Sequence, residues 1–74
     1  MAEDPLSPAQ RHVLQREQRV AEQTKRVARM RADGASERAI AAGEAVLVVL
    51  RRSLELARAD LAMERRARGR TPSD

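Results

Sequence analysis

The positions of glycine and proline divide this chain into two long segments. Neither residue occurs between Pro8 and Gly34, and only Gly43 interrupts the chain between Gly34 and Gly69. Because glycine and proline break helices more strongly than other residues, both segments are free to form long helices. The run AVLVVL at 45–50 has a strand-like composition, but no turn signals bound it and its flanks favour helix. The sequence therefore predicts an all-α protein.

Capping signals predict where each helix begins and ends. Ser7 is a good N-cap for a helix that begins at Pro8, and Gln10 can complete a capping box. Gly34 can adopt the left-handed conformation that ends a helix, and Ser36 can cap the next one. We expect a first helix at about 8–32, a turn at 33–36 and a second helix at about 37–67, between a flexible acidic lead at 1–6 and a flexible basic and polar tail at 68–74.

Apolar side chains at seven-residue spacing predict how the two helices pack. The first segment carries Val13, Val20 and Val27, and the second carries two adjacent rows at the same spacing. This pattern is typical of a coiled-coil seam, and a short connector joins two such helices into an antiparallel hairpin. The predicted hairpin seam consists of Val13, Val20, Val27, Ile40, Leu47, Leu50, Leu54 and Leu61. The expected neighbours are Val27 with Ile40 and Gly43, Val20 with Leu47 and Leu50, Val13 with Leu54, and Leu6 with Leu61.

A further apolar row lies on the other side of the second segment. Val49, Leu56 and Met63 recur every seven residues, roughly 160° round the helix from the seam at 100° per residue. The first segment is too narrow and too polar to cover both sides of the second. The predicted partner or dimer face is therefore Val48, Val49, Leu56 and Met63. Two hairpins that meet there are expected to form a homodimeric four-helix bundle, and a different protein is the alternative partner.

The length of the chain also favours a partner. Chains shorter than roughly 70–80 residues rarely obtain more than about 3–5 kcal/mol from a single core, and this chain has 74 residues. It contains 0 Cys, so no disulfide can stabilise it, and the lone His12 cannot hold a metal by itself. Oligomerisation or an unusually regular helix pair remains as the source of stability.

Composition weighs against several classes of function. Aromatic residues make up 0% of the chain, whereas single-stranded nucleic-acid modules and most small-molecule pockets depend on them. The helical neighbours of His12 supply neither a nucleophile nor an orienting carboxylate. Asp60 and Glu64 are four residues apart but lie among arginines, as a solvated charge pattern does. We expect no catalytic residue, no cofactor, no metal and no small-molecule substrate.

The basic end of the second segment raises the question of nucleic acid. The formal net charge is +4, and the candidate phosphate contacts are Arg65, Arg66, Arg68 and Arg70. Basic residues are also common at helix C-termini because they oppose the helix dipole, so nucleic acid is the less favoured partner. No stretch approaches the roughly 20 apolar residues that cross a bilayer, and the start MAEDPLSP lacks the features of a signal peptide. A cytoplasmic location without membrane contact is expected.

The stretch RHVLQREQRVAEQTKRVARMRADG, followed by SERAIAAGEAVLVVLRRSLELARADL, resembles a set of uncharacterised small bacterial helical-hairpin proteins. Their first helix has the pattern RHVxEGExRIxRQ. Arg16 stands here where that pattern has glycine. The resemblance implies a hairpin fold and no particular activity. The matching residues are Arg11, His12, Val13, Glu17, Arg19, Val20 and Gln23, with Val20 in place of the similar isoleucine of that pattern.

These features together predict a non-enzymatic protein–protein interaction module. It would act by surface binding, as an adaptor, a small regulator or an inhibitor does. The alternative is a basic helical protein associated with nucleic acid.

Overall fold

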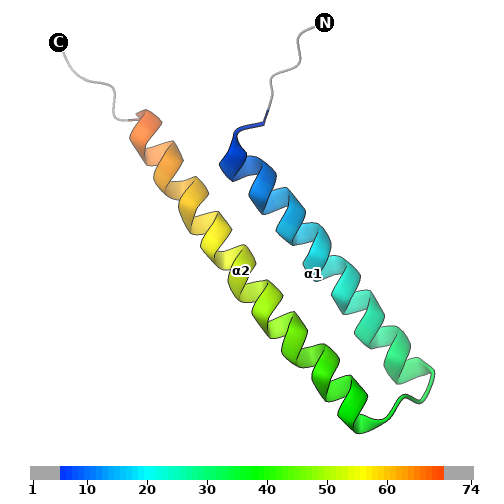
Figure 1. Cartoon of the computed structure of the whole chain (residues 1–74). Helices are drawn as coiled ribbons and strands as arrows, with labels where there is room; N and C mark the ends of the chain where they lie inside the picture. Colours follow the sequence, from blue (N-terminus) through cyan, green and yellow to red (C-terminus); the bar gives the residue numbers. More distant parts are fainter. Residues whose placement is uncertain (1–5, 70–74) are drawn as a thin grey trace, which may run out of the picture.

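The chain folds into two antiparallel helices that lie side by side along their length (Figure 1). The structure is a computed structural model and describes residues 6–69. Helix α1 spans Pro8–Ala32 and helix α2 spans Glu37–Gly69. The all-α two-helix hairpin predicted from the sequence is confirmed.

Helix α1 begins with the predicted capping box. The backbone N–H of Gln10 donates to Oγ of Ser7 at 3.1 Å, and the backbone N–H of Ser7 donates to Oε1 of Gln10 at 2.9 Å. Pro8 occupies the first turn, where its missing N–H leaves no hydrogen bond unmade. Two backbone donors at the start of the helix are satisfied in this way, which fixes where α1 begins.

The turn between the helices is built around Gly34. The N–H of Gly34 donates to the carbonyl of Arg31 at 3.2 Å, and the N–H of Ala35 donates to the carbonyl of Met30 at 2.9 Å. This pair of bonds forms a Schellman motif, which needs a residue in the left-handed region just past the helix. Gly34 fills that position with φ of 76°. The predicted helix stop is therefore confirmed, together with its mechanism.

Replacing Gly34 with alanine should destabilise the hairpin. An L residue in the left-handed conformation is disfavoured by roughly 1–2 kcal/mol, so Gly34→Ala should lower the free energy of unfolding by about that amount. Urea denaturation followed by circular dichroism measures this change. Gly69→Ala is the matched control, because Gly69 has no positive φ and a Cβ there meets nothing within 4 Å. Equal stability of the two variants would contradict the role given to Gly34.

Helix α2 begins as expected and ends later than expected. The N–H of Ala39 donates to Oγ of Ser36 at 3.1 Å, which confirms the predicted cap. The helix continues to Gly69, two residues beyond the expected end at about 67, and residues 70–74 of the expected tail lie outside the described residues. Arg68 stands in the last turn, where its positive charge opposes the helix dipole, and it pairs with Glu64 at 3.8 Å.

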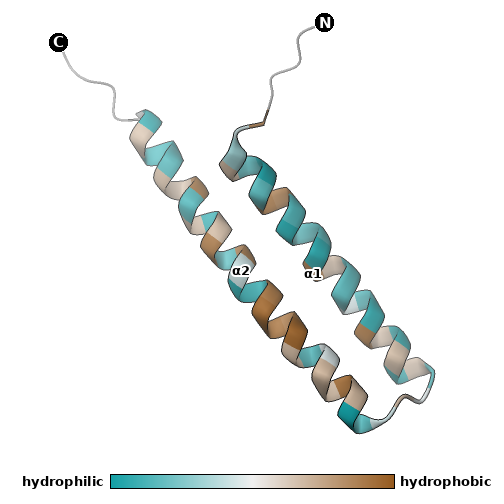
Figure 2. Cartoon of the chain, viewed as in Figure 1, coloured by the Kyte–Doolittle hydropathy of each residue, from teal (hydrophilic) through white to brown (hydrophobic). Residues whose placement is uncertain are grey.

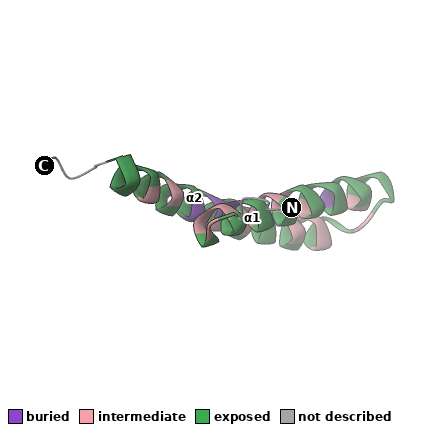
Figure 3. Ribbon diagram, turned by 90° about the horizontal axis from the view of Figure 1, so that it is seen from above, coloured by how far each residue is buried: buried purple, intermediate pink, exposed green. Residues whose placement is uncertain are grey.

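The core between the two helices is thin, and only a few residues of either helix are buried (Figure 3). Among residues 6–69 no polar or charged residue is buried. Val13, Leu54 and Ala57 form one cluster, with Val20 and Leu61 packed against it. Two helices offer each other only one face, so few side chains are enclosed on all sides. The buried residues are Val13, Val27, Leu47, Leu54 and Ala57.

The remaining predicted seam residues lie at the edges of this line. Val20, Ile40, Leu50 and Leu61 are half-buried. In the expected register Leu6 and Leu61 line the same groove at the open end of the hairpin, and Val13 clusters with Leu54. The seam is therefore placed as predicted, but half of its members remain partly open to solvent because no third helix covers them.

The helices approach closely at Gly43. A Cβ built on Gly43 would lie 3.1 Å from Cγ2 of Val27 and 3.5 Å from Sδ of Met30. Beside this contact, Nε2 of Gln23 donates to the carbonyl oxygen of Gly43 at 2.9 Å and joins the two helices. The predicted contact between Val27 and Gly43 is confirmed, and it explains a glycine inside a helix that would otherwise prefer alanine.

Filling the space at Gly43 should therefore destabilise the hairpin. Leucine is a better helix former than glycine, yet Gly43→Leu should lower the free energy of unfolding by about 1–3 kcal/mol because its side chain overpacks against Val27. Gly43→Ala should lack the gain of about 1 kcal/mol that alanine normally brings to a helix interior. Thermal melting of both variants checks the order. A leucine variant more stable than the wild type would show that the helices are not held closely here.

Two ion pairs join the helices at the edge of the seam. Nη2 of Arg58 on α2 donates to Oε2 of Glu17 on α1 at 3.3 Å, and Arg31 on α1 pairs with Glu44 on α2. All four side chains are well exposed, so each pair contributes little to stability, typically about 0–1 kcal/mol. The two pairs help to set the register of α1 against α2, because they form in the observed alignment and would be lost if one helix shifted by a turn.

Candidate interaction surface on the second helix

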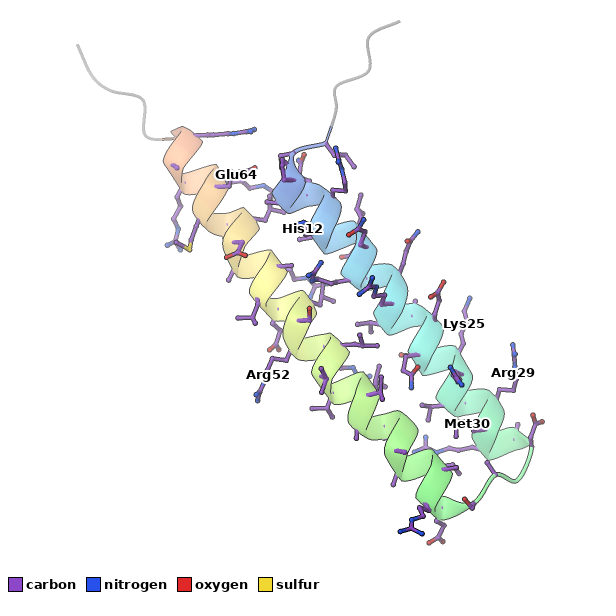
Figure 4. The ribbon with its side chains drawn as sticks, in the orientation of Figure 1. His12, Lys25, Arg29, Met30, Arg52 and Glu64 are labelled. Atoms are coloured by element: carbon purple, nitrogen blue, oxygen red, sulfur yellow. The ribbon has the colours of Figure 1, made fainter. Side chains whose placement is uncertain are left out.

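The side of α2 that faces away from α1 carries a row of exposed apolar side chains, with Arg52 among them. Val49, Leu56 and Met63 are 65%, 63% and 64% exposed, and we call these three residues the outer strip. Their spacing of seven residues keeps them on one side of the helix, because seven residues make nearly two turns. Arg52 lies on the same side and points away from α1 (Figure 4). The structure thus leaves the predicted partner face uncovered.

The apolar surface widens in the middle of α2. Val48 and Val46 flank Val49 and are 59% and 48% exposed. The most hydrophobic part of the ribbon lies near the middle of α2, while α1 is mainly hydrophilic (Figure 2). The sequence from 39 to 50 contains one charged residue, Glu44, and that carboxylate pairs with Arg31. A partner that approaches this part of α2 therefore meets little charge.

Two shallow grooves extend this surface onto the flat faces of the hairpin. Val48 lines a groove of 470 Å³ on one face, together with Val27 and Leu47. Val46 lines a groove of 380 Å³ on the opposite face, together with Met30 and Gly43. Both grooves run between the helices and open to solvent. They offer a partner a way to extend its contact beyond α2 itself.

Helix α1 cannot cover the outer strip. Its own apolar stripe, formed by Val13, Val20 and Val27, faces α2 and is used in the seam. Lys25 and Arg29 point away from α2 (Figure 4). The two helices thus differ in kind, since α1 has one apolar side and α2 has two.

Sequence reasoning missed part of the exposed apolar surface on α1. Leu6 and Leu14 are 44% and 48% exposed and line a groove with Val13 and Leu61 at the open end of the hairpin. The signal was present, because Leu14 is one residue past a seam position and so lies about 100° away from the seam. Leu6 precedes Ser7, the N-cap of α1, so the position of its side chain depends on the backbone before the helix and not on heptad spacing.

The candidate phosphate contacts are spread over part of the last turns of α2. Arg65, Arg66 and Arg68 are exposed there. At 100° per residue, Arg65 and Arg68 lie about 60° apart on neighbouring positions, and Arg66 lies about 100° from Arg65 on the other side. Arg68 also pairs with Glu64. Arg70 lies outside the described residues.

The residues considered for acid–base chemistry, His12 and Asp60, lie on different helices. No group of three or more His, Cys, Asp or Glu side chains in the part described is placed to hold a metal ion. His12 is exposed on α1, and Asp60 is exposed on α2. Within residues 6–69, neither helix combines the length and hydropathy that a membrane span requires.

Comparison with known proteins adds no relative. The chain matches no protein family model, no curated protein and no solved structure.

Proposed function

We propose that this chain is a non-enzymatic protein–protein interaction module whose binding surface is the outer strip of α2. The observation that carries the proposal is the exposure of Val49, Leu56 and Met63, each above 60%, in a row along one side of a helix. Contiguous apolar surface of this kind on a soluble protein marks an interaction site. A module of this type acts by occupying the surface of its partner.

The energetics of the strip support the proposal. Burying a Val, Leu or Met side chain completely is worth about 1.5–3 kcal/mol relative to leaving it exposed. Each strip residue has already lost about a third of its exposure to its own helix, so a partner gains somewhat less from each. Together with Val46 and Val48, the outer strip accounts for five of the seven large hydrophobic residues that are exposed in the described part of the chain.

The nucleic-acid alternative has weaker support. Phosphate binding depends on several basic side chains that neutralise neighbouring phosphates at once. Of the three described arginines at this end, only Arg65 and Arg68 lie on neighbouring positions of one side of the helix, and Glu64 competes for Arg68. The basic residues at this end are accounted for by the dipole of α2, which favours cations near its C-terminus.

Site-specific photo-cross-linking tests the proposed function. A photoreactive amino acid at Leu56, in the outer strip, should yield cross-linked protein adducts in the source cell. The same amino acid at Gln18, which is exposed on α1, is the matched control. Adducts with this chain itself or with another protein, formed at Leu56 and not at Gln18, support the proposal. Equal or absent cross-linking at the two positions would refute it.

A further inference from the structure

We propose that the occupant of the outer strip is α2 of a second copy of this chain, packed antiparallel with a two-fold axis near Leu54. This inference rests on the proposed function and names the partner that the strip binds. It follows from three properties of α2: the sizes of its outward side chains, the placement of its charges and its length.

The outward side of α2 carries a complete coiled-coil pattern of its own. Each residue of the outer strip is preceded, four positions earlier, by a second outward residue, so two rows alternate along the helix as core positions of a coiled coil do. All of these residues are exposed in the hairpin. We call the combined set the outer seam: Ala45, Val49, Arg52, Leu56, Ala59 and Met63.

Side-chain size favours an antiparallel pair. In an antiparallel coiled coil, residues of one row face residues of the other row. Met63 then faces Ala45 of the second copy, and Val49 faces Ala59. A large side chain meets a small one in each of these layers, which lets the two surfaces interdigitate. A parallel pair would place Ala59 against Ala59 and Met63 against Met63, which leaves a gap in one layer and crowds another.

Charge favours the same orientation. In the antiparallel register, the two-fold axis gathers both Arg52 and both Glu55 side chains. Each guanidinium then lies beside a Glu55 carboxylate of the second copy, so positive and negative charges alternate around the axis. Arg52 and Glu55 are both exposed, and neither makes an ion pair within the described hairpin. A parallel pair would set Arg52 against Arg52 in the seam and bring Glu55 near Asp60 of the second copy. Like charges at these positions select against the parallel form.

The length of α2 fits this register. The midpoint between Ala45 and Met63 is residue 54, where the two-fold axis falls. Helix α2 spans Glu37–Gly69, so its own midpoint is residue 53. Two copies related by this axis therefore overlap along nearly the whole of α2, and neither helix end projects far beyond the other.

The resulting assembly is an open layer. The outer strip lies across α2 from the seam with α1, so the four helices follow one another in the order α1, α2, α2, α1. Both copies of α2 are in the middle, covered on two sides. The proposed assembly is therefore a flat layer of four helices with both faces open to solvent, and it differs from the closed four-helix bundle expected from the sequence.

Distance measurement between two spin labels tests the orientation. The chain has 0 Cys, so Arg38→Cys provides a single labelling site on the wild-type background. Residue 38 is 16 positions from the axis, so the labels of an antiparallel dimer are separated by 32 residues, or about 48 Å. Parallel helices would bring them within about 20 Å. A distance near 48 Å supports the proposal, and a short distance overturns it.

Absence of any dipolar coupling, with sedimentation at the monomer mass, also overturns the proposal. That outcome leaves the proposed function testable, because adducts of Leu56 with a different protein would still identify the strip as a binding surface. Failure of both experiments would remove the strip as an interaction site altogether.

Exchange of two charges tests the register independently. Arg52→Glu and Glu55→Arg should each weaken the dimer on the order of tenfold, because either change gathers four like charges at the axis. The double variant should restore wild-type affinity. Circular dichroism confirms that the exposed substitutions leave the hairpin folded. A double variant as weak as the single ones would overturn this register.

Discussion

Leu54→Lys should unfold the hairpin. Leu54 is 7% exposed and packs in the cluster with Val13 and Ala57. Removing a buried leucine side chain typically costs about 2–5 kcal/mol, and an unpaired buried charge adds to that loss. A chain of this size has about 3–5 kcal/mol from its core, so the substitution removes most of its stability. Far-ultraviolet circular dichroism should show the loss of most helical signal at room temperature.

Leu56→Lys is the matched control for this change. Leu56 is two residues away in the same helix, carries the same side chain and is 63% exposed. Its replacement should leave the helical signal intact at concentrations where the chain is monomeric. Leu47→Lys, at the other buried leucine, should behave like Leu54→Lys. A hairpin that melts cooperatively with lysine at position 54 would show that the seam is not the core.

The double substitution Val49→Lys and Leu56→Lys should abolish self-association. The wild type should sediment at micromolar concentration with twice the chain mass of 8.2 kDa, and the variant with 8.2 kDa. Each apolar side chain withdrawn from the interface removes up to about 1.5–3 kcal/mol, and symmetry counts it twice, so the dissociation constant should rise at least a hundredfold. The melting temperature should also fall, because dimerisation stabilises the folded chain by mass action.

The control for this prediction carries the same two charges elsewhere. Gln15→Lys and Gln18→Lys place lysines on exposed positions of α1 and should leave the dimer unchanged. A wild type that remains at 8.2 kDa throughout the micromolar range would contradict self-association through the outer strip. The comparison with the α1 variant separates that outcome from a general effect of added charge.

Local signals account for what the sequence predicted well. The capping box at Ser7, the stop at Gly34 and the cap at Ser36 each depend on a few neighbouring residues, so they are visible without a structure. The close contact at Gly43 was also predictable, because heptad spacing and a short turn together fix the register.

Features that depend on how many neighbours surround a helix were harder to predict. Leu50 and Ala57 belong to the same heptad row, yet the structure buries Ala57 and leaves Leu50 half-buried. Leu50 lies at the edge of the seam, beside an open groove lined by Arg19 and Arg26. Heptad spacing identifies the inward side of a helix, whereas the depth of burial depends on a crossing geometry that no single residue encodes.

The ion pairs between α1 and α2 were also hard to predict from the sequence. Glu17 and Arg58 are far apart in the chain and meet because the register brings exposed positions of the two helices together. Many charged residues on each helix offer alternative pairings, so composition alone selects none of them. The end of α2 at Gly69 lies within two residues of the expected end at about 67, because helix ends are set by weak local interactions such as the pair of Arg68 with Glu64.

The hairpin brings Leu6 and Gly69, the first and last described residues, to the same end, opposite the turn at Gly34 (Figure 1). This connectivity limits how two copies can be joined into one polypeptide. In the antiparallel pair, Gly69 of one copy and Leu6 of the next lie a full α2 length apart, about 50 Å at 1.5 Å per residue. The peptide between them must then contain about 15 extended residues, of which residues 70–74 and 1–5 already supply ten, so an added linker needs about five. A tandem chain with a shorter linker would therefore pair with other tandem chains and form chain-like polymers.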